Sequence, residues 1–223
     1  MRRIVKTHPP AELNTWCEEN KEHNHSYSDM LGTEAHQKLK VKLLKEQGWL
    51  CAYTGIKIEN ETSHVEHLKP QTTCDEWEDV EYRNVVACFP ADGGDKSHGY
   101  GAPIKGGWWE KEKFISPLTN DCERRFKFSW SGHVSPNPED HQSAKMTIDV
   151  LRLDERALRL LRKSRIDGFF GFGARTRARP LSIAEAKVAL ENIDRFDGNG
   201  RLREFCFVLK QLLPKYIARA EAK

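Results

Sequence analysis

The segment that most constrains this chain is residues 63–70, with the sequence Ser-His-Val-Glu-His-Leu-Lys-Pro. Successive side chains of a β-strand point to opposite faces. Glu66 and His67 can therefore share one site only where the strand ends or kinks, and Pro70 supplies such an ending. A carboxylate binds a hard divalent cation, and a histidine exchanges a proton near neutral pH. The segment predicts metal-assisted hydrolysis, with Glu66 as a metal ligand and His67 as the general base.

Two later stretches offer residues that complete such a site. Asn84 precedes a short apolar run, where we expect it to orient the histidine or to contact the metal. An asparagine at such a place is also a common cap or turn residue. Residues 90–107 form a glycine-rich loop, and a loop this long is usually functional or disordered. Asp92, Asp95 and His98 compete there for the last ligand position, with His98 favoured and Asp95 as an alternative. Such a site favours Mg²⁺ or Mn²⁺ as the cofactor.

Hydrophobic periodicity predicts a small strand region followed by helices. A helix is expected over residues 34–47, with Thr33 as its N-cap and Gly48 as its stop. Residues 49–58 are expected to form a strand or a hairpin arm with its bend at Thr54-Gly55, and residues 62–68 a second strand, which places a strand–loop–strand unit before Asn84. Later elements are a hairpin within residues 125–134, a helix opened by the Ser182-Ile183-Ala184-Glu185 capping box, and a helix over residues 201–220.

These elements divide the chain into three parts. Residues 1–32 form an N-terminal arm that we expect to dock a partner, residues 33–136 form the catalytic core, and residues 137–223 form a helical C-terminal region. No apolar run approaches membrane-spanning length, and no apolar stretch follows the basic N-terminus. A cytoplasmic location with free cysteines is therefore expected.

The distribution of charge is more informative than the net charge of +3. Residues 152–179 hold nine basic and three acidic residues, and basic faces can neutralise phosphates. Solvated surface charge is the other interpretation of such a run. Candidate contacts to nucleic acid or to a partner are Lys69, Arg156, Arg159, Lys163, Arg175 and Arg177.

Several motifs between residues 38 and 166 carry a family resemblance. They are Leu50-Cys51-Ala52-Tyr53-Thr54-Gly55, His64-Val65-Glu66-His67-Leu68-Lys69-Pro70-Gln71, Tyr82-Arg83-Asn84-Val85-Val86-Ala87-Cys88-Phe89-Pro90, Phe114-Ile115-Ser116-Pro117-Leu118 and Asp121-Cys122-Glu123-Arg124-Arg125-Phe126. In this order they resemble the HNH nuclease subunit (PtuB) of Septu-type anti-phage systems, also found as a retron-associated HNH protein. The resemblance implies a nuclease that works with an ABC/OLD-like ATPase and cuts nucleic acid during phage infection.

The resemblance also raises the question of a structural zinc ion. Many HNH proteins carry two Cys-x-x-Cys pairs, but here Thr54 and Ala91 stand in the second position of each pair. Cys51 and Cys88 remain, and His98 and Cys74 are the candidates to replace the missing ligands. Zn²⁺ binding and burial of Cys51 and Cys88 as small hydrophobic residues are both open.

Taken together, we expect an α+β protein in which a small ββα-metal (HNH) core is embedded in a mainly helical chain. The expected function is metal-dependent hydrolysis of DNA under the control of an ATPase partner. The alternatives are a non-catalytic subunit that binds nucleic acid or a partner around a structural metal, and a nuclease that cuts RNA.

Overall fold

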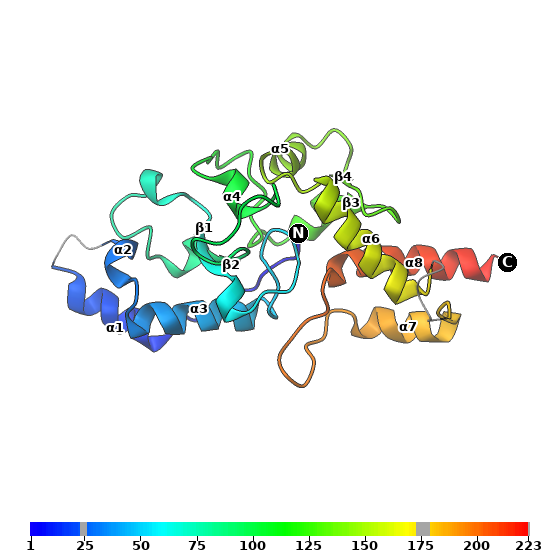
Figure 1. Ribbon diagram of the computed structural model, residues 1–223, viewed down its shortest axis with the longest axis horizontal. Coiled ribbons are helices and arrows are strands. Elements are labelled where there is room, and N and C mark those ends of the chain that lie inside the picture. The colour runs from blue at the N-terminus through cyan, green and yellow to red at the C-terminus, as the bar shows by residue number, and fades with distance from the viewer. Residues whose placement is uncertain (23–25, 173–178, 223) are drawn as a thin grey trace.

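The computed structural model describes residues 1–22, 26–172 and 179–222. The molecule is elongated, with the first helices at one end, the strands near the middle and the C-terminal helices at the other end (Figure 1). The described residues form eight α-helices and two antiparallel sheets of two strands each, so the fold is α+β as expected. No helix in these three described ranges has the length and apolar character needed to cross a membrane.

Three helices form the N-terminal end of the molecule, and the third is the helix predicted over residues 34–47. They are α1 (Ala11–Asn20), α2 (Tyr27–Met30) and α3 (Glu34–Glu46). The Thr33 side chain accepts a hydrogen bond from the backbone N–H of His36, and Gly48 has the left-handed conformation that ends a helix. The predicted cap and stop of α3 are therefore confirmed.

The first sheet pairs β1 (His64–His67) with β2 (Val85–Cys88) in an antiparallel register. All four residues of β2 are buried. The side-chain amide of Gln47, just after α3, bonds to both the N–H and the C=O of Ala87. The edge of β2 that faces away from β1 is thus closed, and α3 is fixed against the sheet.

The elements around β1 differ from the predicted ones. Residues 49–58 make a tight turn in place of a strand: Leu50 and Lys57 form an isolated bridge, and the Gly55 N–H bonds to the carbonyl of Cys51. The strand–loop–strand order expected before Asn84 is not present, because the second strand of this sheet, β2, follows Asn84. The next helix along the chain is the four-residue α4 (Ala102–Lys105).

The remaining elements of the middle region frame the first sheet. They are the hairpin of β3 (Phe126–Phe128) and β4 (Val134–Pro136), the helix α5 (Gln142–Val150), and short 3-10 turns at Asn60–Thr62, Gln71–Thr73, Tyr82–Asn84 and Cys122–Arg125. The hairpin predicted within residues 125–134 is confirmed, with its second strand extending to Pro136.

The C-terminal region is helical as expected. Its helices are α6 (Arg156–Phe170), α7 (Ile183–Asn192) and α8 (Cys206–Glu221). The capping box between Ser182 and Glu185 is present. α8 begins at Cys206, later than the predicted residue 201, because Phe205 adopts a left-handed backbone conformation that interrupts the helix.

The turn before β1 packs directly on the start of α8. Gly55 has a φ of 78°, and a Cβ atom placed on it would lie 2.3 Å from a ring carbon of Phe207. The carbonyl of Gly55 also accepts a hydrogen bond from the backbone N–H of Phe205 at 3.1 Å. The segment before the first sheet and the C-terminal helices therefore share one close backbone contact.

We expect Gly55→Ala to lower the free energy of unfolding by about 3 kcal/mol, because the methyl group would strain the backbone and overlap the Phe207 ring. The measurement is urea denaturation. Gly198→Ala is the matched control, since nothing lies within 4 Å of its Cβ position, and it should change stability by less than about 0.5 kcal/mol. Equal stability of the two variants would contradict the contact.

Candidate active site on strand β1

Strand β1 separates its four side chains between two faces. His64 and Glu66 lie on the partly exposed face, and Val65 and His67 lie on the buried face. The strand runs regularly through His67, which pairs with Val85. The expected ending of the strand does not bring the side chains of Glu66 and His67 to the same face, because the alternation of the strand persists to its last residue.

Glu66 lies in a cluster of three polar partners. The hydroxyl of Tyr53 donates to Oε1 at 3.2 Å, and Nζ of Lys105 donates to the same oxygen at 3.0 Å. Nε2 of His64 lies 3.5 Å from Oε2. Burial favours the neutral acid, but the contacts with His64 and Lys105 prevail and lower the pKa of Glu66. The carboxylate is thus ionised at neutral pH.

His64 joins the candidate site, although sequence reasoning passed over it. Its Nδ1 donates to the carbonyl of Pro90, which leaves Nε2 facing Glu66. Burial opposes its charged form, yet the hydrogen bonds to Glu66 and Pro90 raise the pKa of His64. The signal in the sequence was its spacing: residues two apart on a strand share a face.

A pocket of about 230 Å³ opens beside this pair. Its lining includes His64, Glu66, Asp92 and Lys96. Mg²⁺ usually keeps several water ligands and is bound by one or two carboxylates together with substrate phosphates. Glu66 offers a carboxylate oxygen and His64, in its neutral form, offers Nε2, so this pair fits a hydrated divalent ion whose other ligands are water and a substrate phosphate.

His67 occupies the opposite face in a different environment. Its Nε2 lies 2.8 Å from the backbone carbonyl of Asp79. A carbonyl can only accept, so Nε2 carries the proton and Nδ1 is the basic nitrogen of the neutral ring. Burial lowers the pKa of His67, against the opposing effect of the Asp79 carbonyl. The ring of Tyr27, from α2, packs edge-on against His67 with centroids 4.6 Å apart. His67 is therefore a neutral imidazole held in one tautomer.

Asn84 braces the loop that carries the carbonyl partner of His67. Its Oδ1 accepts from the Lys69 N–H at 2.8 Å, and its Nδ2 donates to the carbonyls of Lys69 and Glu78, both at 3.1 Å. Glu78 directly precedes Asp79. Asn84 thus fixes the loop next to the Asp79 carbonyl, with no hydrogen bond of its own to His67 among the described residues.

The other two predicted ligands lie elsewhere. The Asp95 carboxylate accepts hydrogen bonds from the N–H and hydroxyl of Ser97 and is exposed to solvent. The His98 ring packs against Phe89 and Tyr100. Within the described ranges, no three His, Cys, Asp or Glu side chains lie close enough together to hold a metal ion. The predicted set of Glu66, His98 and Asp95 is not assembled, because the glycine-rich loop carries the last two away from β1.

Cys51 and Cys88, the two candidate zinc ligands, lie within hydrogen-bond distance of each other. Cys51 and Cys88 are buried free thiols. Burial opposes ionisation, but hydrogen bonds from Cys88 and from Thr54 lower the pKa of Cys51 to about 6. In the described residues these two thiols have no third and fourth cysteine or histidine close by to complete a tetrahedral site.

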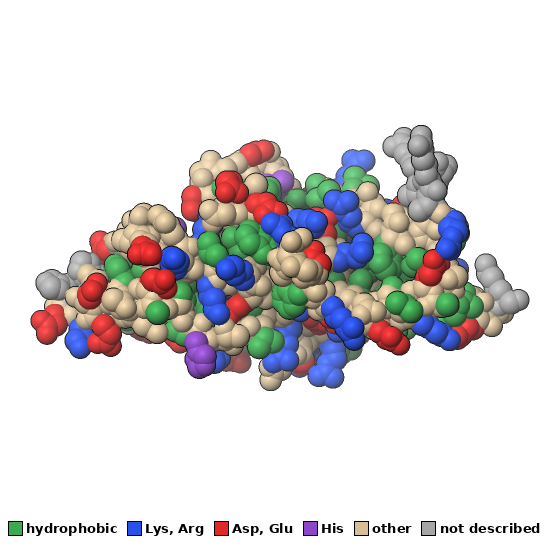
Figure 2. Space-filling model, turned by 90° about the horizontal axis from the view of Figure 1, so that it is seen from below, with side chains coloured by type: hydrophobic (Ala, Val, Ile, Leu, Met, Phe, Trp, Pro, Cys, Tyr) green, Lys and Arg blue, Asp and Glu red, His purple; other side chains and the backbone are tan. Residues whose placement is uncertain are grey.

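Three of the four predicted phosphate contacts that the structure describes are already paired within the protein. Lys69 contacts Asp75 and Glu78, Arg159 contacts Asp154, and Lys163 contacts Asp167, whereas Arg156 is exposed on α6. Arg175 and Arg177 lie outside the described residues. Figure 2 shows lysine and arginine side chains spread among acidic and apolar ones over the middle of the molecule, without one continuous basic patch.

We expect Asn84→Ala to lower the free energy of unfolding by about 2 kcal/mol, since three backbone groups would lose their hydrogen-bond partner. Chemical denaturation measures this change. Asn192→Ala is the control, because the exposed Asn192 makes one hydrogen bond, to the Val188 carbonyl, and should cost less than about 0.5 kcal/mol. An unaltered stability of Asn84→Ala would contradict the bracing role.

Comparison with known proteins gives one informative relative. No family model matches the chain. A protein of Vibrio cholerae serotype O1 biovar El Tor, named "Retron Vc95 putative HNH endonuclease", is 28% identical over 132 residues. The match covers 54% of this chain and 60% of the length of that protein. Over about half of its length, the chain is thus similar to a protein named as an HNH endonuclease.

Proposed function

We propose that the chain is a metal-dependent HNH endonuclease that hydrolyses DNA phosphodiester bonds. The observation that carries the proposal is the state of His67, whose Nε2 is committed to the Asp79 carbonyl while Nδ1 remains the basic nitrogen. Glu66, which directly precedes His67, is an ionised carboxylate that lines the pocket of about 230 Å³. A neutral base and a metal-binding carboxylate are the two groups that hydrolysis by a bound metal requires.

In the proposed reaction, His67 accepts a proton from the attacking water at Nδ1. The imidazolium that forms keeps its Nε2–H bonded to the Asp79 carbonyl, which stabilises the new charge and prevents the ring from turning. Burial that lowers the pKa of His67 keeps the ring neutral before the reaction. Asn84 contributes indirectly by holding the loop that presents the carbonyl.

Glu66 and His64 are the residues that would hold Mg²⁺ or Mn²⁺, with Asp92 on the same pocket wall. The ion would supply charge stabilisation at the phosphate and the leaving oxygen. Because Glu66 and His67 point to opposite faces of β1, we place the phosphodiester across the end of this strand, where it can meet both side chains.

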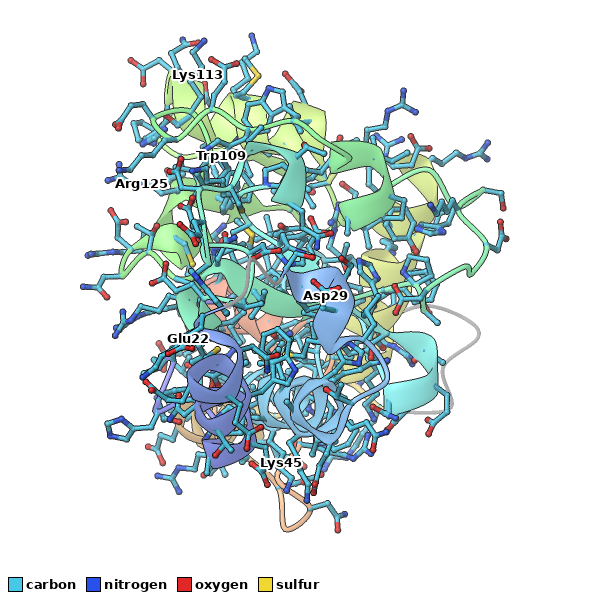
Figure 3. The ribbon with its side chains drawn as sticks, turned by 90° about the vertical axis from the view of Figure 1, so that its left-hand side faces the viewer. Glu22, Asp29, Lys45, Trp109, Lys113 and Arg125 are labelled. Carbon is cyan, nitrogen blue, oxygen red and sulfur yellow. The ribbon has the colours of Figure 1, made fainter. Side chains whose placement is uncertain are left out.

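We further propose that the protein acts in anti-phage defence under an ATPase partner. The resemblance to Septu-type HNH subunits and the match to a retron protein support this proposal. The N-terminal arm offers a route for control: Tyr27 covers His67, and its N–H bonds to the Asp79 carboxylate at 2.7 Å. Figure 3 views the molecule from the end that holds the first helices, and it shows α2, which carries Asp29, in front of the strands.

We expect His67→Ala to reduce DNA cleavage at least about 100-fold, since a general base typically contributes this much or more. The assay follows relaxation of supercoiled plasmid with Mg²⁺ or Mn²⁺, with and without the proposed ATPase partner, and includes an RNA substrate. His133→Ala is the matched control, because His133 is exposed and pairs with Asp154 far from β1 in sequence.

The outcomes separate the candidate functions. Cleavage of plasmid by wild type and by His133→Ala, but not by His67→Ala, would support the proposal. Cleavage of RNA alone would replace DNA by RNA as substrate. Absence of cleavage under every condition would overturn the nuclease proposal in favour of a non-catalytic binding subunit.

A further inference from the structure

Lys105 is a buried cation that sequence reasoning did not assign to the site. Its side chain is 1% exposed, and burying an ammonium group is costly unless it is paired and hydrogen-bonded. Nζ donates to Oε1 of Glu66 at 3.0 Å and to the backbone carbonyl of His67 at 2.9 Å. One ammonium group therefore contacts both residues of the proposed metal–base pair.

The surrounding backbone holds Lys105 in this position. α4 lies between Gly101 and Gly106, which have φ values of 81° and 50° that other residues rarely adopt. The Gly101 N–H bonds to the carbonyl of Leu151, just after α5, at 2.8 Å. The Lys105 carbonyl accepts from the Trp108 N–H at 3.0 Å. Lys105 thus extends toward β1 from a helix that is anchored at both ends.

The contacts of Glu66 are unequal between its two oxygens. Oε1 accepts from both Lys105 and Tyr53, whereas Oε2 faces His64 and the pocket. A cation that bound Oε1 would have to displace the ammonium group, since two positive charges would otherwise lie a few ångströms apart. A metal ion can bind Oε2 without breaking the contacts of Oε1 with Lys105 and Tyr53, and it would replace only the contact between Oε2 and His64.

We propose that Lys105 is a positioning residue that reserves Oε1 of Glu66 and leaves Oε2, beside His64, as the binding position for a divalent ion. The inference rests on the proposed function for the identity of Glu66 as a metal ligand. Lys105 fixes the direction of the carboxylate and, through its charge, weakens the affinity of the site for the ion. The full ion affinity is then reached only when a substrate phosphate adds its own negative charge.

The test is a titration of the DNA-free protein with Mn²⁺, followed by the free Mn²⁺ signal in electron paramagnetic resonance. Lys105→Gln keeps an N–H donor, one bond shorter than the ammonium group, and removes the charge. Even at the dielectric constant of water, loss of a unit charge about 6 Å from a divalent ion changes affinity by a factor of about ten. We therefore expect Lys105→Gln to bind Mn²⁺ about tenfold more tightly than wild type.

Four variants make the result specific. Lys105→Met should also bind Mn²⁺ more tightly, Lys105→Arg should bind like wild type because the charge is kept, and Glu66→Gln should lose binding. Lys96→Met is the matched control: Lys96 lines the same pocket but is exposed, so its charge is screened and its loss should have a small effect. Circular dichroism establishes whether each variant is folded. If Lys105→Met does not fold, the Mn²⁺ affinity of Lys105→Gln alone tests the inference.

An unchanged or weaker affinity of Lys105→Gln for Mn²⁺ would overturn the inference, as would full binding by Glu66→Gln. A merely structural ion pair would lower stability without tightening Mn²⁺ binding. Plasmid cleavage by the same proteins keeps the two proposals apart. If Lys105→Gln binds Mn²⁺ more tightly but the wild-type protein cuts no plasmid, the nuclease proposal is refuted and the role of Lys105 is supported. If the wild-type protein cuts plasmid but Lys105→Gln binds Mn²⁺ with unchanged affinity, the nuclease proposal is supported and the role of Lys105 is refuted.

Discussion

The alternation of side chains along β1 is the constraint on which the candidate site depends. Because the strand stays regular through His67, Glu66 and His67 face different surroundings. Glu66 meets an ammonium group and an imidazole that keep it ionised, while His67 is buried against Tyr27 and the Asp79 carbonyl. One four-residue strand thus places a carboxylate and an imidazole next to each other in sequence while directing their side chains to opposite faces.

The rest of the fold supports this strand from several sides. β2 pairs with β1, and Gln47 closes the outer edge of β2 through Ala87. Asn84 holds the loop before the Asp79 carbonyl, and Lys105 reaches the strand from α4. Each support is a set of hydrogen bonds to buried groups, which cost free energy when they are left unpaired. The site is therefore held by polar contacts as much as by its apolar core.

The sequence predicted the elements whose signals are local. The Thr33 cap, the Gly48 stop and the Ser182 capping box each depend on neighbours within a few residues. It did not predict that β1 pairs with a strand beyond Asn84, since strand pairing is decided by contacts distant along the chain. For the same reason the role of Lys105, 39 residues from Glu66, went unnoticed. Alternating polarity located β1 but could not say what packs on each of its faces.

The measurement that tests the central claim most directly is chemical rescue of His67→Ala in single-turnover hydrolysis of a labelled DNA duplex. If His67 acts as the base through Nδ1, added imidazole should restore part of the lost rate, in proportion to the concentration of its neutral form. Hydrolysis by His67→Ala at the wild-type rate without imidazole would contradict the account, because another group would then be removing the proton from the attacking water.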